Sequence, residues 1–109
     1  MKRIQKRGDS RRMKRFAMKH MARDVFLLYR LFEEPACSAE ISIGDGRVYS
    51  LSVTKISEGG RGRTIRYIHD IARTRTEADH IFSVLSRACV PPETAEEITG
   101  DLIGFYEIG

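Results

Sequence analysis

Residues 48–56 read VYSLSVTKI, and this stretch decides the fold. Apolar and polar side chains alternate along it, which is typical of a β-strand that turns one face to the core. The inward set is Tyr49, Leu51 and Val53, and the outward set is Ser50, Ser52 and Thr54. The sequence therefore predicts a strand whose hydroxyl-bearing face stays wet or binds something.

Turn signals and further alternating segments surround this strand. Residues 38–43 alternate, and the glycines of Gly44-Asp45-Gly46 accept positive φ at low cost, which predicts a hairpin turn. Residues 58–62, EGGRG, predict a second turn before a last strand over Thr64–Ile71. The core residues expected on that strand are Ile65, Tyr67 and Ile71.

Two helices are predicted after the strands. Thr74 and Glu77 form a capping box, and Pro92 can begin the second helix at its first turn. The buried stripes are Ala78, Ile81, Phe82, Leu85 and Cys89, then Ala95, Ile98, Leu102 and Phe105. Gly100 and Gly104 lie four residues apart and favour close packing on the sheet or on a second copy. The predicted fold class is α+β, an antiparallel three- or four-stranded β-meander followed by two C-terminal α-helices packed on one face.

The start of the chain is strongly basic. Residues 1–23 hold ten of the nineteen Lys and Arg but one of the fifteen Asp and Glu, which leaves a net charge of +9 there and −5 in the remainder. Apolar spacings of three and four from Met13 predict a helix to about residue 24. Residues 25–32 fit a continued helix or a strand, and we favour a strand over 26–33. We expect a basic, partly helical N-terminal arm at 1–24 and a small α+β domain at 25–109.

A basic arm attracts polyanions such as RNA, DNA, anionic lipid or an acidic protein surface. Phe16 lies within the arm and can stack on a base or pack on the domain as a hydrophobic staple. Arg61 and Arg63 of the second turn are candidate hairpin contacts, although a single such segment more often serves only as a turn. The candidate polyanion-binding residues are Arg7, Arg11, Arg12, Lys14, Arg15 and Lys19. The alternative is a solvated extension with no partner.

No catalytic or metal-binding motif is present in the sequence. The histidines and cysteines lack metal-ligand spacing, His69 has no nucleophile that can be paired with it, and neither cysteine has a neighbour that would lower its thiol pKa. These residues are His20, His69, His80, Cys37 and Cys89. We therefore predict no catalytic residue, no metal ligand and no cofactor. No apolar run reaches the about 20 residues of a membrane span, and we expect a cytoplasmic protein with free thiols.

Several segments of the sequence are similar to those of a known family. The sequence contains YRLFEEP, then YSLSV, then IHDIA, and then TEADHIFSVLSRACVPPETAEEITGDL. Over about residues 26–105 this resembles a family of small uncharacterised proteins of Clostridium-like Gram-positive bacteria, a domain of unknown function. The pattern is carried by Asp70-Ile71, by Pro91 or Pro92, and by Asp101-Leu102, and Gly100 departs from it where an acid is usual. The resemblance implies a bacterial, cytoplasmic α+β protein and no activity.

Three functional hypotheses follow. The first is a non-enzymatic adaptor, regulator or inhibitor that docks on an unknown protein or nucleoprotein partner through its sheet face or last helix, with the arm adding affinity for polyanions; a mobile element would be a fitting source. The second is a protein that binds RNA or DNA directly through the arm. The third is a small enzyme with an unrecognised site. We also expect that an edge strand at 26–33 or 38–43 would favour a homodimer.

Overall fold

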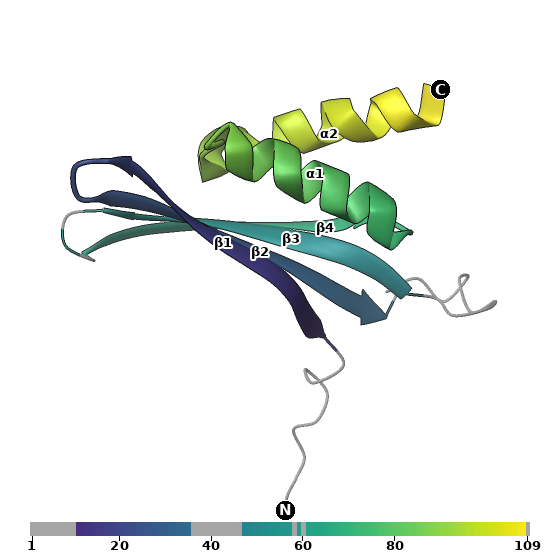
Figure 1. Ribbon diagram of the computed structural model, residues 1–109, viewed down its shortest axis with the longest axis horizontal. Helices are drawn as coiled ribbons and strands as arrows, with labels where there is room; N and C mark the ends of the chain where they lie inside the picture. The colour runs from purple at the N-terminus through teal and green to yellow at the C-terminus, as the bar shows by residue number, and fades with distance from the viewer. Residues whose placement is uncertain (1–10, 36–46, 58, 60, 109) are drawn as a thin grey trace, which may run out of the picture.

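The four strands of the described chain form one antiparallel sheet. In this computed structural model, which describes residues 11–35, 47–57, 59 and 61–108, the spatial order of the strands is β1-β2-β3-β4. The elements are β1 (Arg12–Ala22), β2 (Val25–Pro35), β3 (Arg47–Ser57), β4 (Gly62–Ala72), α1 (Arg75–Arg87) and α2 (Pro92–Ile108). Both helices lie on the same face of the sheet (Figure 1). The predicted meander with two C-terminal helices is confirmed, and the strand and turn predicted at 38–46 lie outside the described residues.

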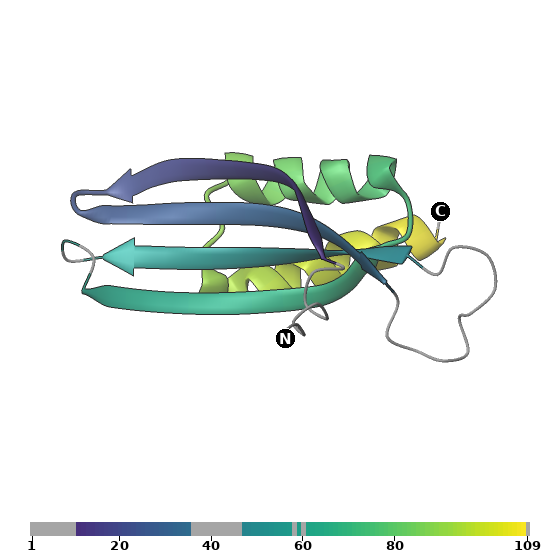
Figure 2. The same cartoon turned by 90° about the horizontal axis from the view of Figure 1, so that it is seen from below.

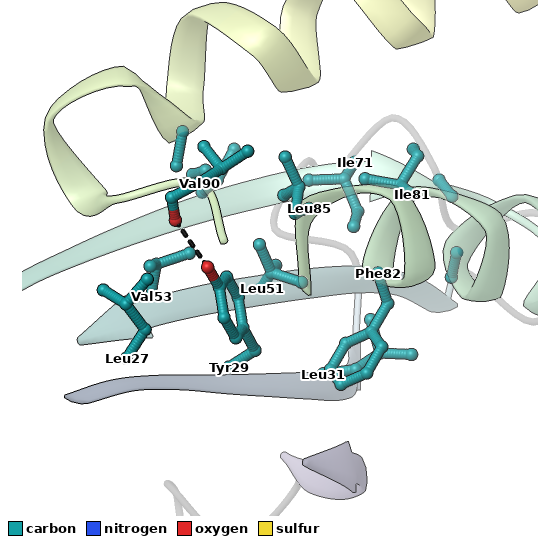
Figure 3. Packing of buried hydrophobic residues seen from close by; sticks show 14 residues of the cluster. Leu27, Tyr29, Leu31, Leu51, Val53, Ile71, Ile81, Phe82, Leu85 and Val90 are labelled. Carbon is teal, nitrogen blue, oxygen red and sulfur yellow. Dashed lines mark hydrogen bonds between the residues drawn. The ribbon is translucent and has the colours of Figure 1, made fainter. Parts of the chain in front are cut away.

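The core lies between the helices and the inner strands. Tyr29 pairs with Val53 and Leu31 with Leu51, and all four side chains are fully buried on the helix side of the sheet. Figure 3 shows the helices placing their apolar stripes on this layer. The cluster is Leu27, Tyr29, Leu31, Leu51, Val53, Ile68, Ile71, Ala72, Ala78, Ile81, Phe82, Leu85, Val90 and Ala95. The inward positions predicted from the alternation at 48–56 are therefore confirmed for Leu51 and Val53.

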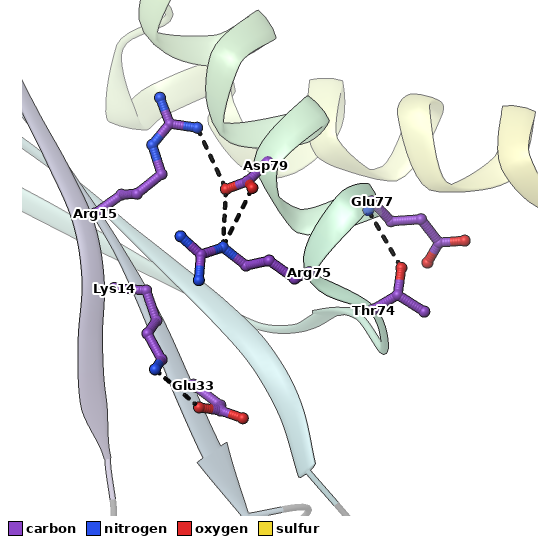
Figure 4. A network of polar contacts seen from close by, with 7 residues as sticks. All are labelled: Lys14, Arg15, Glu33, Thr74, Arg75, Glu77 and Asp79. Carbon is purple, nitrogen blue, oxygen red and sulfur yellow. Dashed lines mark hydrogen bonds and ion pairs between the residues drawn. The ribbon is translucent and has the colours of Figure 1, made fainter.

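The ends of α1 are fixed by local hydrogen bonds. The backbone N–H of Glu77 donates to Oγ1 of Thr74 at 3.2 Å, which confirms the predicted cap (Figure 4). At the other end Cys89 has a φ of 53°, and Val90 N–H donates to the Leu85 carbonyl at 3.0 Å. This is the six-to-one bond of a helix end that usually carries glycine at the left-handed position. The reversal brings Val90 over the sheet.

One buried hydrogen bond joins this reversal to the inner sheet. The phenol of Tyr29 donates to the carbonyl of Val90 at 2.7 Å (Figure 3). Burial, together with the negative charge that Cys89 can carry, raises the pKa of Tyr29 above its ordinary value. The bond therefore depends on a phenol that stays protonated, and it fixes the link between α1 and α2 above β2.

The helix predicted from Met13 to about residue 24 is wrong, because Arg12–Ala22 is strand β1. Its register with β2 shifts between Met13, which faces Phe32, and Arg15, which faces Leu31. This β-bulge sets Met13 and Phe16 three residues apart on one face, and that spacing imitates a helical period. The strand predicted at 26–33 is confirmed as part of β2, but it is an inner strand because β1 covers it. The edge expected there is wrong, and the edges of the described sheet are β1 and β4.

One expectation about packing is also wrong, and a second is wrong for the sheet, while its alternative of a second copy stays a prediction. Ile65 and Tyr67 were expected in the core, but they remain 42% and 39% exposed. They pair with Thr54 and Ser52, so the antiparallel register places them on the face away from the helices, and Ile68 fills the core. Added Cβ atoms at Gly100 and Gly104 would meet nothing within 4 Å, so these glycines make no close contact with the described sheet.

We expect Tyr29→Phe to lower the free energy of unfolding by about 1–2 kcal/mol, because the buried Val90 carbonyl loses its donor. The raised pKa means that the folded state holds the phenolic proton more tightly than the unfolded state does. The contribution of Tyr29 to the free energy of unfolding should then be fully present below about pH 10 and be lost as the pH rises above that value. In the Tyr29→Phe variant the free energy of unfolding should therefore fall less steeply over the same pH range. Urea unfolding between about pH 8 and 11 measures both effects. Parallel declines in the two proteins would contradict the assignment to Tyr29.

We expect Gly100→Ala to raise the free energy of unfolding by about 1 kcal/mol, because alanine favours an exposed helical position and its Cβ has open space. Urea unfolding measures the change, with Glu97→Ala, at another exposed position of α2, as the control. A loss of stability on Gly100→Ala would show that a neighbour, such as a second copy, packs against this glycine.

Candidate functional site

The sheet face opposite the helices is the candidate site, and we call it the open face. Figure 2 shows the four strands in front and both helices behind them. The antiparallel register arranges the side chains of the open face in rows across the strands. One row is Phe16, Arg30, Ser52 and Tyr67, and the next is Met18, Leu28, Thr54 and Ile65.

Large apolar side chains gather on the open face. Phe16 is 61% exposed, and its neighbours in the register share its orientation. Such side chains are common singly on a protein surface, and several of them on one uncovered face favour a surface that binds something. The exposed group consists of Met13, Phe16, Met18, Phe26, Ile65 and Tyr67.

Arginines and histidines lie among these apolar side chains. The Arg11 guanidinium carbon is 4.7 Å from the ring centre of Phe32 and 5.5 Å from that of Tyr67. Arg11 therefore reaches from above β2 to above β4, at distances typical of cation–π contacts. His20 stacks on Phe26 with ring centres 4.9 Å apart, and the rings of Tyr67 and His69 are 6.1 Å apart. The open face thus combines cationic groups with accessible aromatic rings.

The hydroxyl row of β3 lies between these larger side chains. Ser50, Ser52 and Thr54 are 1%, 0% and 3% exposed, so the expectation that this row stays wet is wrong. Their small side chains are covered by the larger ones that β2 and β4 place beside them in the register. The described residues offer no hydrogen-bond partner to Ser52 Oγ, Thr54 Oγ1 or Arg30 Nε. A buried polar atom without a partner is costly, and these three atoms are covered by neighbouring side chains in the free protein.

The cations expected to form one polyanion site are distributed over both faces. Arg15 lies on the helix side, 3.3 Å from Asp79 and 4.3 Å from the Phe82 ring centre (Figure 4). Lys14 pairs with Glu33 at 3.4 Å, as the same view shows. Lys19 pairs in register with Leu27 on the helix side, Arg12 is exposed opposite Glu33, and Arg7 lies outside the described residues.

Other predicted contact residues reach or approach the open face. Arg63 pairs in register with Ile56 on that face, and Arg61 is exposed in the turn before β4. The alternative of Phe16 as a staple on the core is wrong, because its ring points away from the helices. Arg30 and Phe26 are not predicted as contact residues from the sequence, because they lie in a stretch that is apolar on both faces. Tyr67 is predicted in the core, and only the pairing with β3 shows that it faces outward.

His69 and Ser50 meet at one carboxylate near the end of the open face. His69 Nδ1 lies 3.2 Å from Oε2 of Glu34, and the Ser50 hydroxyl donates to the same oxygen. Nucleophilic catalysis by a serine needs the imidazole between the hydroxyl and the carboxylate. Here the carboxylate lies in the middle, so His69 does not contact the Ser50 hydroxyl, and the arrangement ties β2, β3 and β4 together.

Within the described part of the chain, no three or more His, Cys, Asp or Glu side chains cluster as metal ligands. Its helices are too short or too polar to cross a membrane. No family model, curated protein or solved structure matches the chain. The resemblance noted from the sequence therefore stays a prediction.

We expect Thr54→Val to leave the free energy of unfolding unchanged or to raise it by up to about 1 kcal/mol, because the buried hydroxyl has no partner to lose. Thr74→Val is the matched control, and it should cost about 1 kcal/mol because it removes the cap of α1. Urea unfolding of both variants measures the contrast. An equal loss in the two would show that the Thr54 hydroxyl is hydrogen-bonded in the free protein.

Proposed function

We propose that this protein is a non-enzymatic adaptor or regulator that holds a macromolecular partner on its open face. The observation that supports this most strongly is the gathering of exposed aromatic, Met and Ile side chains on the one sheet face that the helices leave uncovered. Burial of apolar surface under a partner stabilises a complex by about 25 cal/mol per Å² removed from water, so these exposed side chains favour binding.

The shape of the open face favours a large partner. The exposed residues are spread over β1, β2 and β4, and the rows of the register run across the whole sheet. Small ligands are usually enclosed in a concave site that buries most of their surface. A face that extends over four strands instead offers contacts to a chain or to another surface. The Met side chains adapt their shape, which suits a partner that is not rigid.

The positive charge near the start of the chain is part of the proposal. Arg11 lies over the open face, and the basic residues that precede it in the sequence add affinity for an acidic protein surface or a nucleoprotein. A cytoplasmic setting agrees with this reading. Catalysis by Ser50 is disfavoured by the position of the Glu34 carboxylate between its hydroxyl and His69.

Photo-crosslinking tests the proposal. The full chain with p-benzoylphenylalanine in place of Phe16 should form covalent adducts in extracts of its own cells, because Phe16 is the most exposed aromatic residue of the open face. The matched control carries the same group in place of Arg87, an exposed residue of α1. Adducts formed from position 16 and not from position 87 support the proposal. Equal yields at the two positions, or adducts from position 87 alone, would overturn it.

A further inference from the structure

We propose that the partner on the open face is a single-stranded nucleic acid, with bases stacked on Phe16 and Tyr67 and the sugar–phosphate backbone bound by Arg11 and Arg30. The inference rests on the proposed function and names the chemistry of its partner. It uses Arg11 and Phe16 of the segment predicted as the basic arm, but it places the bases on the sheet.

Charge complementarity is the first argument for a polyanion. β1 and β3 carry no acidic residue, Glu33 of β2 pairs with Lys14, and Asp70 of β4 pairs with Arg73. Glu34 of β2 lies beside His69 and Ser50. Most acidic residues of the described chain lie instead in the helical layer behind the sheet, where Glu93 and Glu96 pair with Lys55 and Arg66 at 2.9 Å. The cationic groups on the open face are Arg11, Arg30 and Arg63.

The second argument is the spacing of the aromatic rings. Phe16 on β1 and Tyr67 on β4 end the same row, three inter-strand steps or about 14 Å apart. This is too far for one base to touch both rings, so each ring would hold its own base. Four-stranded sheets with exposed aromatic residues stack about two or three bases in this way. The His20–Phe26 pair offers a further ring surface along β1 and β2.

The third argument is the polar chemistry between the two rings. Arg30 and Ser52 occupy the middle of the row, and neither Arg30 Nε nor Ser52 Oγ has a hydrogen-bond partner among the described residues. A guanidinium donates to phosphate oxygens, and a hydroxyl can donate to a base or sugar oxygen. Both atoms are covered in the free protein, so a strand crossing from Phe16 to Tyr67 would pair with them only after the side chains above them move aside. An apolar protein surface has no group that could pair with them.

The same charges disfavour a second copy on this face. Two open faces packed together would bring Arg11, Arg30 and Arg63 of each copy into one desolvated layer, where Glu34 is the one carboxylate that the described part of the face offers, already bonded to Ser50. A duplex is also disfavoured, because its base faces are stacked inside and cannot reach Phe16 or Tyr67. The open face therefore selects for unpaired bases.

Fluorescence anisotropy with the purified full-length protein tests the inference. The probes are oligouridylate and oligothymidylate of about 12 nucleotides and a duplex of the same length. We expect the single strands to bind about tenfold more tightly than the duplex. Phe16→Leu and Tyr67→Leu keep apolar bulk but remove the ring, and each should raise the Kd about fivefold or more. Arg30→Gln should lower the slope of log K against log salt by about 0.7.

Control variants separate this site from other sources of affinity. Arg87→Gln removes a charge from the helical layer and should leave the Kd within about twofold of the parent, since the face does not include it. Lys6→Gln with Arg7→Gln tests the basic residues outside the described range. Binding that is lost in this double variant but unchanged in Phe16→Leu would overturn the inference in favour of the arm.

Two further outcomes bear on the occupant. If no single strand binds while adducts from position 16 are digested by protease and not by nuclease, the inference fails and the proposed function stands. If sedimentation equilibrium shows a dimer that Phe16→Leu dissociates, a second copy covers the face and the inference fails. If neither the oligonucleotides nor any cellular component engages position 16, both proposals fail together.

Discussion

The antiparallel pairing of β1 with β2 is the constraint on which the rest of the structure depends. β2 carries Leu27, Tyr29 and Leu31 on the helix side, and without β1 its outer edge would expose unpaired backbone groups beside this core. The pairing also directs Arg15 toward Asp79 and Phe82 of α1. Residues 12–22 are therefore a strand of the sheet rather than a separate arm, and charge-changing substitutions are a sounder way than deletion to probe the basic segment.

The helical layer determines which side of the sheet is left open. The Tyr29–Val90 hydrogen bond and the apolar stripes of α1 and α2 hold this layer on one face. The ion pairs between layers, such as Lys55–Glu93, are exposed and contribute at most about 1 kcal/mol each. The acidic partners of these pairs, Glu93 and Glu96, belong to α2 and so lie on the side of the sheet away from the open face.

The candidate site could be predicted only in part, because its members come from different strands. The alternation at 48–56 correctly placed Ser50, Ser52 and Thr54 opposite the core side chains, although their burial depends on neighbours supplied by β2 and β4. The sequence predicts Phe16 and Arg11 as binding residues of the basic arm, but their position over the sheet follows from the pairing of β1 with β2. The alternation of side chains along β4 is compatible with burial of either face of the strand, so the sequence pattern alone does not tell whether Tyr67 is buried.

The sequence by itself determined the local elements: the strands around 26–33, 48–56 and 64–71, the cap at Thr74, the start of α2 at Pro92 and the apolar stripes of the helices. These depend on side-chain period, proline geometry and local hydrogen bonds, which neighbouring residues encode. Only the tertiary structure decided that residues 12–22 are a strand and that Ile65 and Tyr67 face outward. A β-bulge interrupts the two-residue alternation of side chains in β1, and the buried face of an edge strand is fixed by the strand with which it pairs.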